Sequence, residues 1–169
     1  GLDGVQDYEG DPAEIGRAYF KVLNSHPELF YVEGTIGWSI RNSIASTIYF
    51  HYKYDEDTSE EMQEEYEDAI DYARRTAIHD GMTDEEKVLA VHDYLALHTK
   101  YDYDIALDPG NGDVESYSAY GILVKGLGVC NGYALAMVDI LKREGIPVLF
   151  VAAEEMNHAW NVVQLDGKW

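Results

Sequence analysis

The stretch that decides the fold is Gly126-Leu127-Gly128-Val129-Cys130-Asn131-Gly132-Tyr133-Ala134, which contains the only cysteine of the 169 residues. Apolar residues at helical spacing follow it and predict a helix over 131–144, which Gly145 ends. The unpaired N–H groups and the partial positive charge at the start of a helix stabilise a thiolate. The pattern therefore predicts that Cys130 is a nucleophile, although a cysteine without this context is most simply a small buried apolar residue.

A base for this thiol follows in His158-Ala159-Trp160-Asn161. Pro147 ends any helical tendency, the apolar run 148–153 has the length of a strand, and 158–165 alternates as a second strand that begins at His158. A histidine beside a thiol takes its proton and then pairs with the thiolate as imidazolium. Cys130 and His158 are thus the predicted catalytic pair, and we interpret Trp160 as a core residue.

Together these motifs resemble the transglutaminase-like superfamily, in particular its bacterial secreted branch. The resemblance implies an α+β, papain-like fold: a cysteine at the start of a central helix packs on an antiparallel sheet that carries the histidine, with added N-terminal helices and a β-hairpin. It also implies an extracellular or cell-surface location. The similar segments are 27–31, 84–95, 101–103, 119–124, 128–134, 145–147, 158–163 and 165–169.

The resemblance further implies a third catalytic member, an aspartate on the strand after the histidine strand. It would lie a few residues past a Gly-x-Trp like Gly167-Lys168-Trp169, so we expect it beyond Trp169 and expect the domain to be incomplete at its C-terminal end. Such a carboxylate orients the histidine and stabilises its protonated form. Asp166 does not fit this role, because Asp-Gly predicts a two-residue hairpin turn that points to solvent.

The predicted reaction is formation of a thioester at Cys130 from an amide or peptide carbonyl, with His158 taking the thiol proton and then protonating the leaving amine. The backbone N–H of Cys130 is the expected first oxyanion donor. Tyr120 is the candidate for the second donor, and Tyr117 and Tyr103 stay open as alternatives.

The sequence leaves open what resolves the thioester. Water would make the protein a cysteine protease or amidase, and an amine would make it a protein-glutamine amine transferase. We slightly favour hydrolysis, because no feature identifies an amine-binding channel. The alternative is a catalytically silent cell-surface binding module that keeps the fold, which the 14 tyrosines would suit because their rings contact peptides and carbohydrates well.

Composition restricts the partners. The 32 acidic and 12 basic residues give a formal charge of −20, which disfavours nucleic acid and anionic membranes. No stretch approaches the roughly 20 apolar residues of a membrane span. A protein or peptide substrate, with cell-wall peptide as one candidate, is the expected partner.

The length suits one domain, 1–169, with an N-terminal extension of about 1–82 and a catalytic core of about 83–169. In the extension, Asp11 and Pro12 begin a helix, and 44–54 forms a hairpin with 35–40. An acidic helix follows over about 59–79 with a solvated acidic face. Thr83 and Glu86 then form a capping box for a helix that runs to about 98.

No metal or cofactor is predicted. The carboxylates of 102–115 lack the spacing of a calcium-binding loop, and this segment is interpreted as an ordinary Asp/Gly loop. The histidines outside the catalytic motif lack the spacing of zinc ligands.

Overall fold

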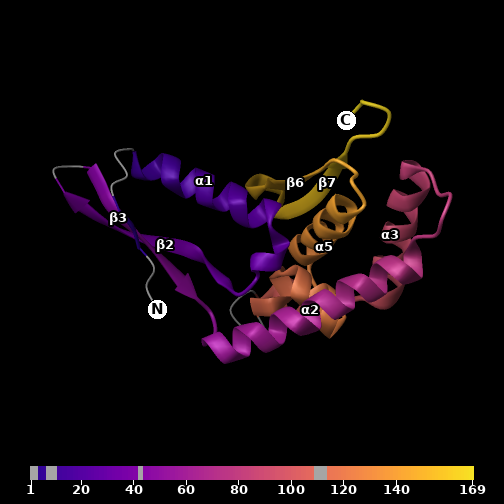
Figure 1. The fold of residues 1–169 in the computed structure, drawn as a ribbon, viewed down its shortest axis with the longest axis horizontal. Coiled ribbons are helices and arrows are strands. Elements are labelled where there is room, and N and C mark those ends of the chain that lie inside the picture. Colours follow the sequence, from indigo (N-terminus) through magenta and orange to yellow (C-terminus); the bar gives the residue numbers. More distant parts are fainter. Residues whose placement is uncertain (1–3, 7–10, 42–43, 109–113) are drawn as a thin grey trace.

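The computed structural model describes residues 4–6, 11–41, 44–108 and 114–169 (Figure 1). Their helices and small sheets confirm the predicted α+β class. The proposed boundary near residue 82 between an extension and a core stays a prediction.

The N-terminal part is a helix beside a three-stranded antiparallel sheet. Strands β1 (Gly4–Gln6), β2 (Val32–Arg41) and β3 (Ile44–Tyr52) lie in the order β1-β3-β2. Helix α1 (Pro12–Ser25) begins where the side chain of Asp11 accepts the backbone N–H of Ala13 at 2.9 Å, as predicted. It runs alongside the hairpin of β2 and β3 (Figure 1), and a short 3₁₀ turn, Pro27–Leu29, joins α1 to β2.

The predicted hairpin is confirmed and is longer than expected. Trp38 pairs with Ile48 and Ile36 with Phe50, but the ladder extends back to Val32. A register irregularity between Val32 and Ile36 breaks the simple alternation, which explains why the sequence pattern identified only the second half of β2.

Three helices build the C-terminal part: α2 (Glu56–Ala77), α3 (Asp84–His98) and α5 (Cys130–Arg143). The predicted start of α2 near 59 was wrong. Asp55 accepts the backbone N–H of Thr58 at 2.9 Å, so the helix begins at Glu56, where acidic residues of the first turn suit the positive end of the helix. The capping box of Thr83 and Glu86 at the start of α3 is confirmed.

Helix α5 is the centre of the molecule. Helix α3 packs on one side of it and the hairpin of β6 (Val148–Ala153) and β7 (His158–Val163) on the other (Figure 1), and α2 reaches it through side chains. Ile70 of α2, Val91 of α3 and Leu141 of α5 are each 0% exposed. Complete burial of such a side chain contributes about 1.5–3 kcal/mol, so these buried side chains stabilise the position of α5 in the core.

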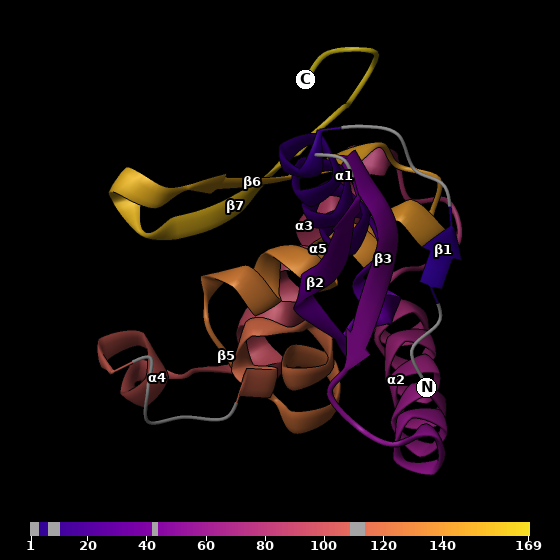
Figure 2. The same ribbon diagram turned by 90° about the vertical axis from the view of Figure 1, so that its left-hand side faces the viewer.

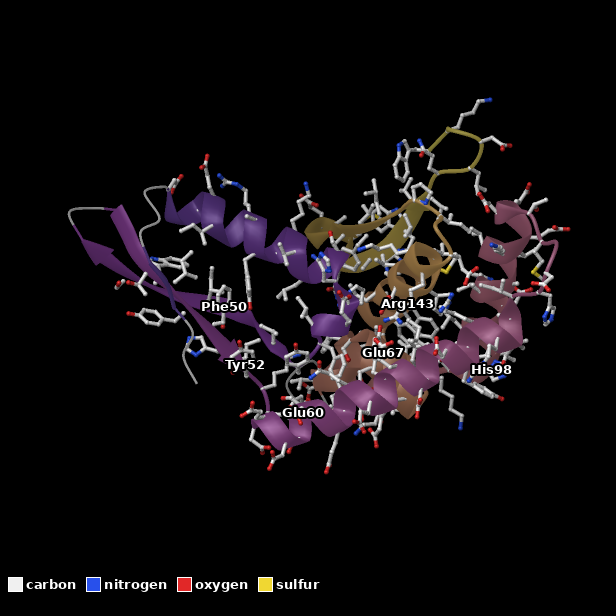
Figure 3. The ribbon with its side chains drawn as sticks, in the orientation of Figure 1. Phe50, Tyr52, Glu60, Glu67, His98 and Arg143 are labelled. Carbon is white, nitrogen blue, oxygen red and sulfur yellow. The ribbon has the colours of Figure 1, made fainter. Side chains whose placement is uncertain are left out.

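A polar cluster fastens α2 to α5 within this core. Tyr66 donates its hydroxyl to the buried carboxylate of Asp139 at 2.6 Å, and Arg143 donates to the other oxygen of Asp139 at 2.8 Å. Arg143 also forms two bonds of 2.6 and 2.7 Å with Glu67, beside it in Figure 3. The acidic face of α2 is therefore not only a solvated surface. Glu67 on this face is exposed, but it also forms an ion pair that links α2 to α5.

The hairpin at the C-terminal end follows the prediction. β6 and β7 pair antiparallel, with Ala153 opposite His158. Asp166 and Gly167 have φ values of 50° and 73°, and Leu165 bridges Lys168, so the predicted two-residue turn is present.

Several short elements were not predicted. Among them, β4 (Lys100–Tyr101) pairs in parallel with β5 (Leu127–Gly128), and α4 (Tyr103–Leu107) is a short helix at the side of the molecule (Figure 2) whose Ile105 is buried. Residues 102–115 were interpreted as an ordinary Asp/Gly loop, and this interpretation was wrong for the start of the segment, which forms α4. Asp102 caps α4 by accepting the N–H of Ile105 at 3.2 Å; residues 109–113 lie outside the described residues.

Candidate active site

Cys130 is the first residue of α5, so its thiol lies at the helix N-terminus as predicted. Val129 precedes it in an extended conformation and provides no side-chain cap. The first N–H groups of the helix therefore have no capping side chain and lie beside the thiol, where a negative charge is favoured. Cys130 is partly exposed, as a nucleophile must be.

Close backbone packing fixes the position of Cys130. The N–H of Val129 donates to the carbonyl of Ser116 at 2.9 Å, and the N–H of Asp102 donates to the carbonyl of Gly128 at 3.0 Å. A Cβ added to Gly128 would lie 2.7 Å from the Ser116 oxygen, and one added to Gly132 would lie 2.8 Å from the Ser118 oxygen. The glycines of the motif thus allow the loop 116–118 to touch both sides of the cysteine.

Asp102 stabilises the loop 116–118 through a buried hydrogen bond. Its carboxylate accepts the hydroxyl of Ser116 at 2.6 Å, and both residues are buried. The pKa of Asp102 is lowered, first by this hydroxyl and then by the N–H of Ile105. The sequence prediction overlooked this pair, although Asp102 lies in a quoted motif, because its partner is distant in the chain.

Tyr101 lies directly against Cys130. Its pKa is raised, first by burial and then by electrostatic interaction with Cys130, while contacts of the phenol with the backbone N–H and the side chain of Cys130 have smaller, opposing effects. The ring stacks on that of Tyr133, with centroids 6.3 Å apart. The parallel pairing of β4 with β5 brings Tyr101 to this position.

The phenol of Tyr101 has two consequences for the site. A tyrosine phenol, with an ordinary pKa of 10.0 that is raised further here, is protonated near neutral pH and can donate a hydrogen bond. Because it lies beside the Cys130 N–H, it is near the point where the oxygen of an acyl group attached to the thiol would develop negative charge. The sequence prediction missed this residue.

The predicted second oxyanion donor occupies a different environment. Tyr120 is 3% exposed and donates its hydroxyl to Glu65 on α2 at 2.5 Å, while its ring stacks on Phe30 at 4.8 Å. Burial and then this hydrogen bond raise its pKa. Its position gives no support to the role predicted for it.

Neither of the two alternatives to Tyr120 lines the Cys130 pocket. Tyr117 contributes its backbone carbonyl, which accepts the side-chain amide of Asn131 at 2.6 Å. Tyr103 is 69% exposed on α4, with its ring 5.1 Å from that of Tyr101. Of the tyrosines considered, Tyr101 is the one that contacts the cysteine.

His158 begins β7 and faces the same pocket as Cys130. Its exposed ring lies against Trp160, with centroids 6.1 Å apart. Trp160 was interpreted as core, but it is only partly buried and lines the pocket. Asn161, from the opposite face of β7, donates its amide to the carbonyl of Ala134 at 3.0 Å and so joins β7 to α5.

The pocket that contains Cys130 and His158 has a volume of about 780 Å³. It lies between α3, α5 and β7, and most of its walls are apolar, as with Val88, Met137 and Val163. Glu85 and His92 of α3 add polar groups at its α3 side. An apolar wall excludes water and strengthens electrostatic interactions with the reacting groups.

The described part of the chain holds no group of three or more His, Cys, Asp or Glu side chains arranged to bind a metal ion. In the same residues, no helix combines the length and the apolar character needed to cross a membrane.

Comparison with known proteins identifies the family of the chain. Residues 70–169, more than half of the chain and including Cys130 and His158, match the Transglutaminase-like superfamily. A solved structure, "Crystal structure of a TGase", is similar in fold, with a TM-score of 0.50 and 18% sequence identity. The similarity covers 99% of this chain and 50% of that one, so this chain spans about half the length of the structure it matches. Among curated proteins, no sequence matches the chain. The chain belongs to the transglutaminase-like superfamily.

Proposed function

We propose that this protein transfers acyl groups from amide or peptide bonds through a thioester on Cys130. The observation that carries the proposal is the joint position of Cys130 and His158 in one pocket, with the thiol at the N-terminus of α5. Membership of a superfamily that generally uses cysteine-based acyl transfer or hydrolysis supports it.

In the proposed mechanism, His158 takes the proton of the thiol, and the sulfur attacks the carbonyl carbon of the amide. The carbonyl oxygen becomes negative and is stabilised by the backbone N–H of Cys130 and the phenol of Tyr101. The protonated His158 then gives its proton to the leaving amine, and a thioester remains.

The second half of the reaction depends on which nucleophile enters. Water, deprotonated by His158, would release a carboxylic acid and restore the thiol; a primary amine would form a new amide. We favour hydrolysis, as a cysteine amidase or protease, because no feature of the sequence identifies an amine-binding channel. We also propose an extracellular or cell-surface location on a bacterium, on the basis of the motif resemblance.

The test incubates the protein with a glutamine-containing protein and a fluorescent primary amine, and separately with a peptide library read by mass spectrometry. Cleavage without incorporation would establish hydrolysis, and incorporation would establish amine transfer. Both must disappear in Cys130→Ala and fall strongly in His158→Ala. If the unchanged protein shows neither activity and forms no adduct with acyl-directed thiol probes, a binding module that keeps the fold should replace the enzyme.

A further inference from the structure

A second groove shares no lining residue with the Cys130 pocket and lies where the β2–β3 hairpin meets the start of α2. Its volume is about 440 Å³. Tyr31, Tyr52 and Tyr54 form its aromatic wall, and the rings of Tyr31 and Tyr52 stack with centroids 6.3 Å apart and an interplanar angle of 11°. Figure 3 shows Tyr52 of β3 near Glu60 of α2 at the base of the hairpin.

The charged side chains that line this groove are all carboxylates: Asp55, Glu56 and Glu60. The pKa of Asp55 is lowered, first by the backbone N–H of Thr58, so this group stays ionised. The N-terminus of α2 adds only about half a positive charge, which three carboxylates exceed. The neighbouring Lys53 donates its ammonium to the carbonyl of Phe30 at 2.6 Å and lines a separate pocket.

An apolar pocket of about 480 Å³ adjoins the groove, and the stacked rings of Tyr31 and Tyr52 line both. Its walls come from α1, with Ile15 and Val22, and from the hairpin, with Phe50 among others. Phe50 points from β3 toward α1 in Figure 3. A ligand that fills both parts would need cationic groups next to apolar ones.

We propose that this groove, defined by Tyr31, Tyr52, Asp55, Glu56 and Glu60, and the apolar pocket beside it together bind a basic amphipathic polypeptide segment. Ammonium or guanidinium groups would lie between tyrosine faces and carboxylates, where cation–π attraction and ion pairing act together. The apolar side chains of the segment would enter between α1 and the hairpin. The formal charge of −20 accelerates encounter with a cationic partner. Neutral sugars would gain no ion pair from these carboxylates.

The test measures binding of a fluorescent peptide built from repeated Leu-Leu-Lys-Lys units to the Cys130→Ala protein, by fluorescence anisotropy. Glu56→Gln combined with Glu60→Gln should raise Kd roughly fivefold or more, because two ion pairs are lost. The matched control combines Glu61→Gln with Asp68→Asn, which removes the same charge from exposed α2 residues outside the groove, and should change Kd by less than about twofold. A peptide with Glu in place of Lys should not bind.

An equal rise of Kd in the two double variants would overturn the proposal, because peptide binding would then depend only on the overall charge of the protein. Binding of a neutral oligosaccharide such as cellohexaose, with no binding of the peptide, would overturn it in favour of a carbohydrate site. Thermal melting followed by circular dichroism would verify that the variants fold. Since the Cys130→Ala protein is used throughout, the result is independent of the proposed catalytic activity.

Discussion

Gly132 offers the sharpest test of how the cysteine is held. It lies on the first turn of α5, and the Cβ of an alanine there would lie 2.8 Å from the carbonyl oxygen of Ser118 and 3.0 Å from that of Ser116. Both oxygens belong to backbone, which cannot yield as the end of a flexible side chain can. The carbonyl of Ser116 also accepts the N–H of Val129, so a shift of this loop disturbs the residue before the thiol.

The size of the effect follows from opposing contributions. Replacing glycine by alanine within a helix stabilises it by about 1 kcal/mol. Overpacking a close contact costs about 1–3 kcal/mol, and losing the bond from Val129 costs about 1 kcal/mol more. Gly132→Ala should therefore lower the free energy of unfolding by about 1–3 kcal/mol, or Tm by roughly 2–4 °C for each kcal/mol.

Urea denaturation and thermal melting would measure this change, and Gly16→Ala is the matched control. Gly16 also lies within a helix, α1, but an added Cβ there meets nothing within 4 Å. That variant should be more stable than the unchanged protein by about 0.5–1 kcal/mol. If Gly132→Ala gained stability as Gly16→Ala does, the claim that close backbone packing holds Cys130 would be refuted.

Three further predictions concern other parts of the structure. Tyr101→Phe removes the proposed oxyanion donor and should lower kcat about 10- to 1000-fold with little change in KM; equal kcat values would contradict that role. Tyr66→Phe deprives buried Asp139 of a hydrogen bond and should lower the free energy of unfolding by about 1–3 kcal/mol in urea titrations, whereas an unchanged midpoint would oppose this. The pKa of Asp102 is lowered below its ordinary value of 3.8, so its carboxylate stabilises the fold above that pH, and this contribution is lost as the pH falls through the lower folded-state pKa. Asp102→Asn should therefore have a lower Tm than the unchanged protein at pH 7, and this difference in Tm should narrow below about pH 4. A difference in Tm that does not depend on pH would contradict the prediction.

The parts of the fold that local sequence signals specify were predictable. Capping residues such as Asp11 and Thr83 mark helix starts by hydrogen bonds within three residues, and the alternation after His158 marks a strand. The start of α5 at Cys130 followed from the same kind of signal, a glycine-rich turn before an apolar helical pattern. These features depend on neighbours in the chain.

The parts that depend on distant partners were not predictable in this way. Tyr101 reaches Cys130 only because β4 pairs in parallel with β5, two strands of two residues each that carry no periodic signal. Tyr120 looked suitable from its place before the cysteine, but its phenol bonds to Glu65, which lies 55 residues away. Choosing among fourteen tyrosines required the tertiary structure.

The most direct test of the central claim, that His158 activates the thiol of Cys130, is the rate of iodoacetamide alkylation at pH 7, followed by mass spectrometry. It needs no knowledge of the natural substrate. We predict that Cys130 in the folded protein reacts roughly tenfold or more faster than in the urea-unfolded protein, and that His158→Ala removes most of this advantage, because the thiolate is the reacting form. A folded protein that reacts no faster than the unfolded chain, or a His158→Ala variant that reacts as fast as the unchanged protein, would contradict the account.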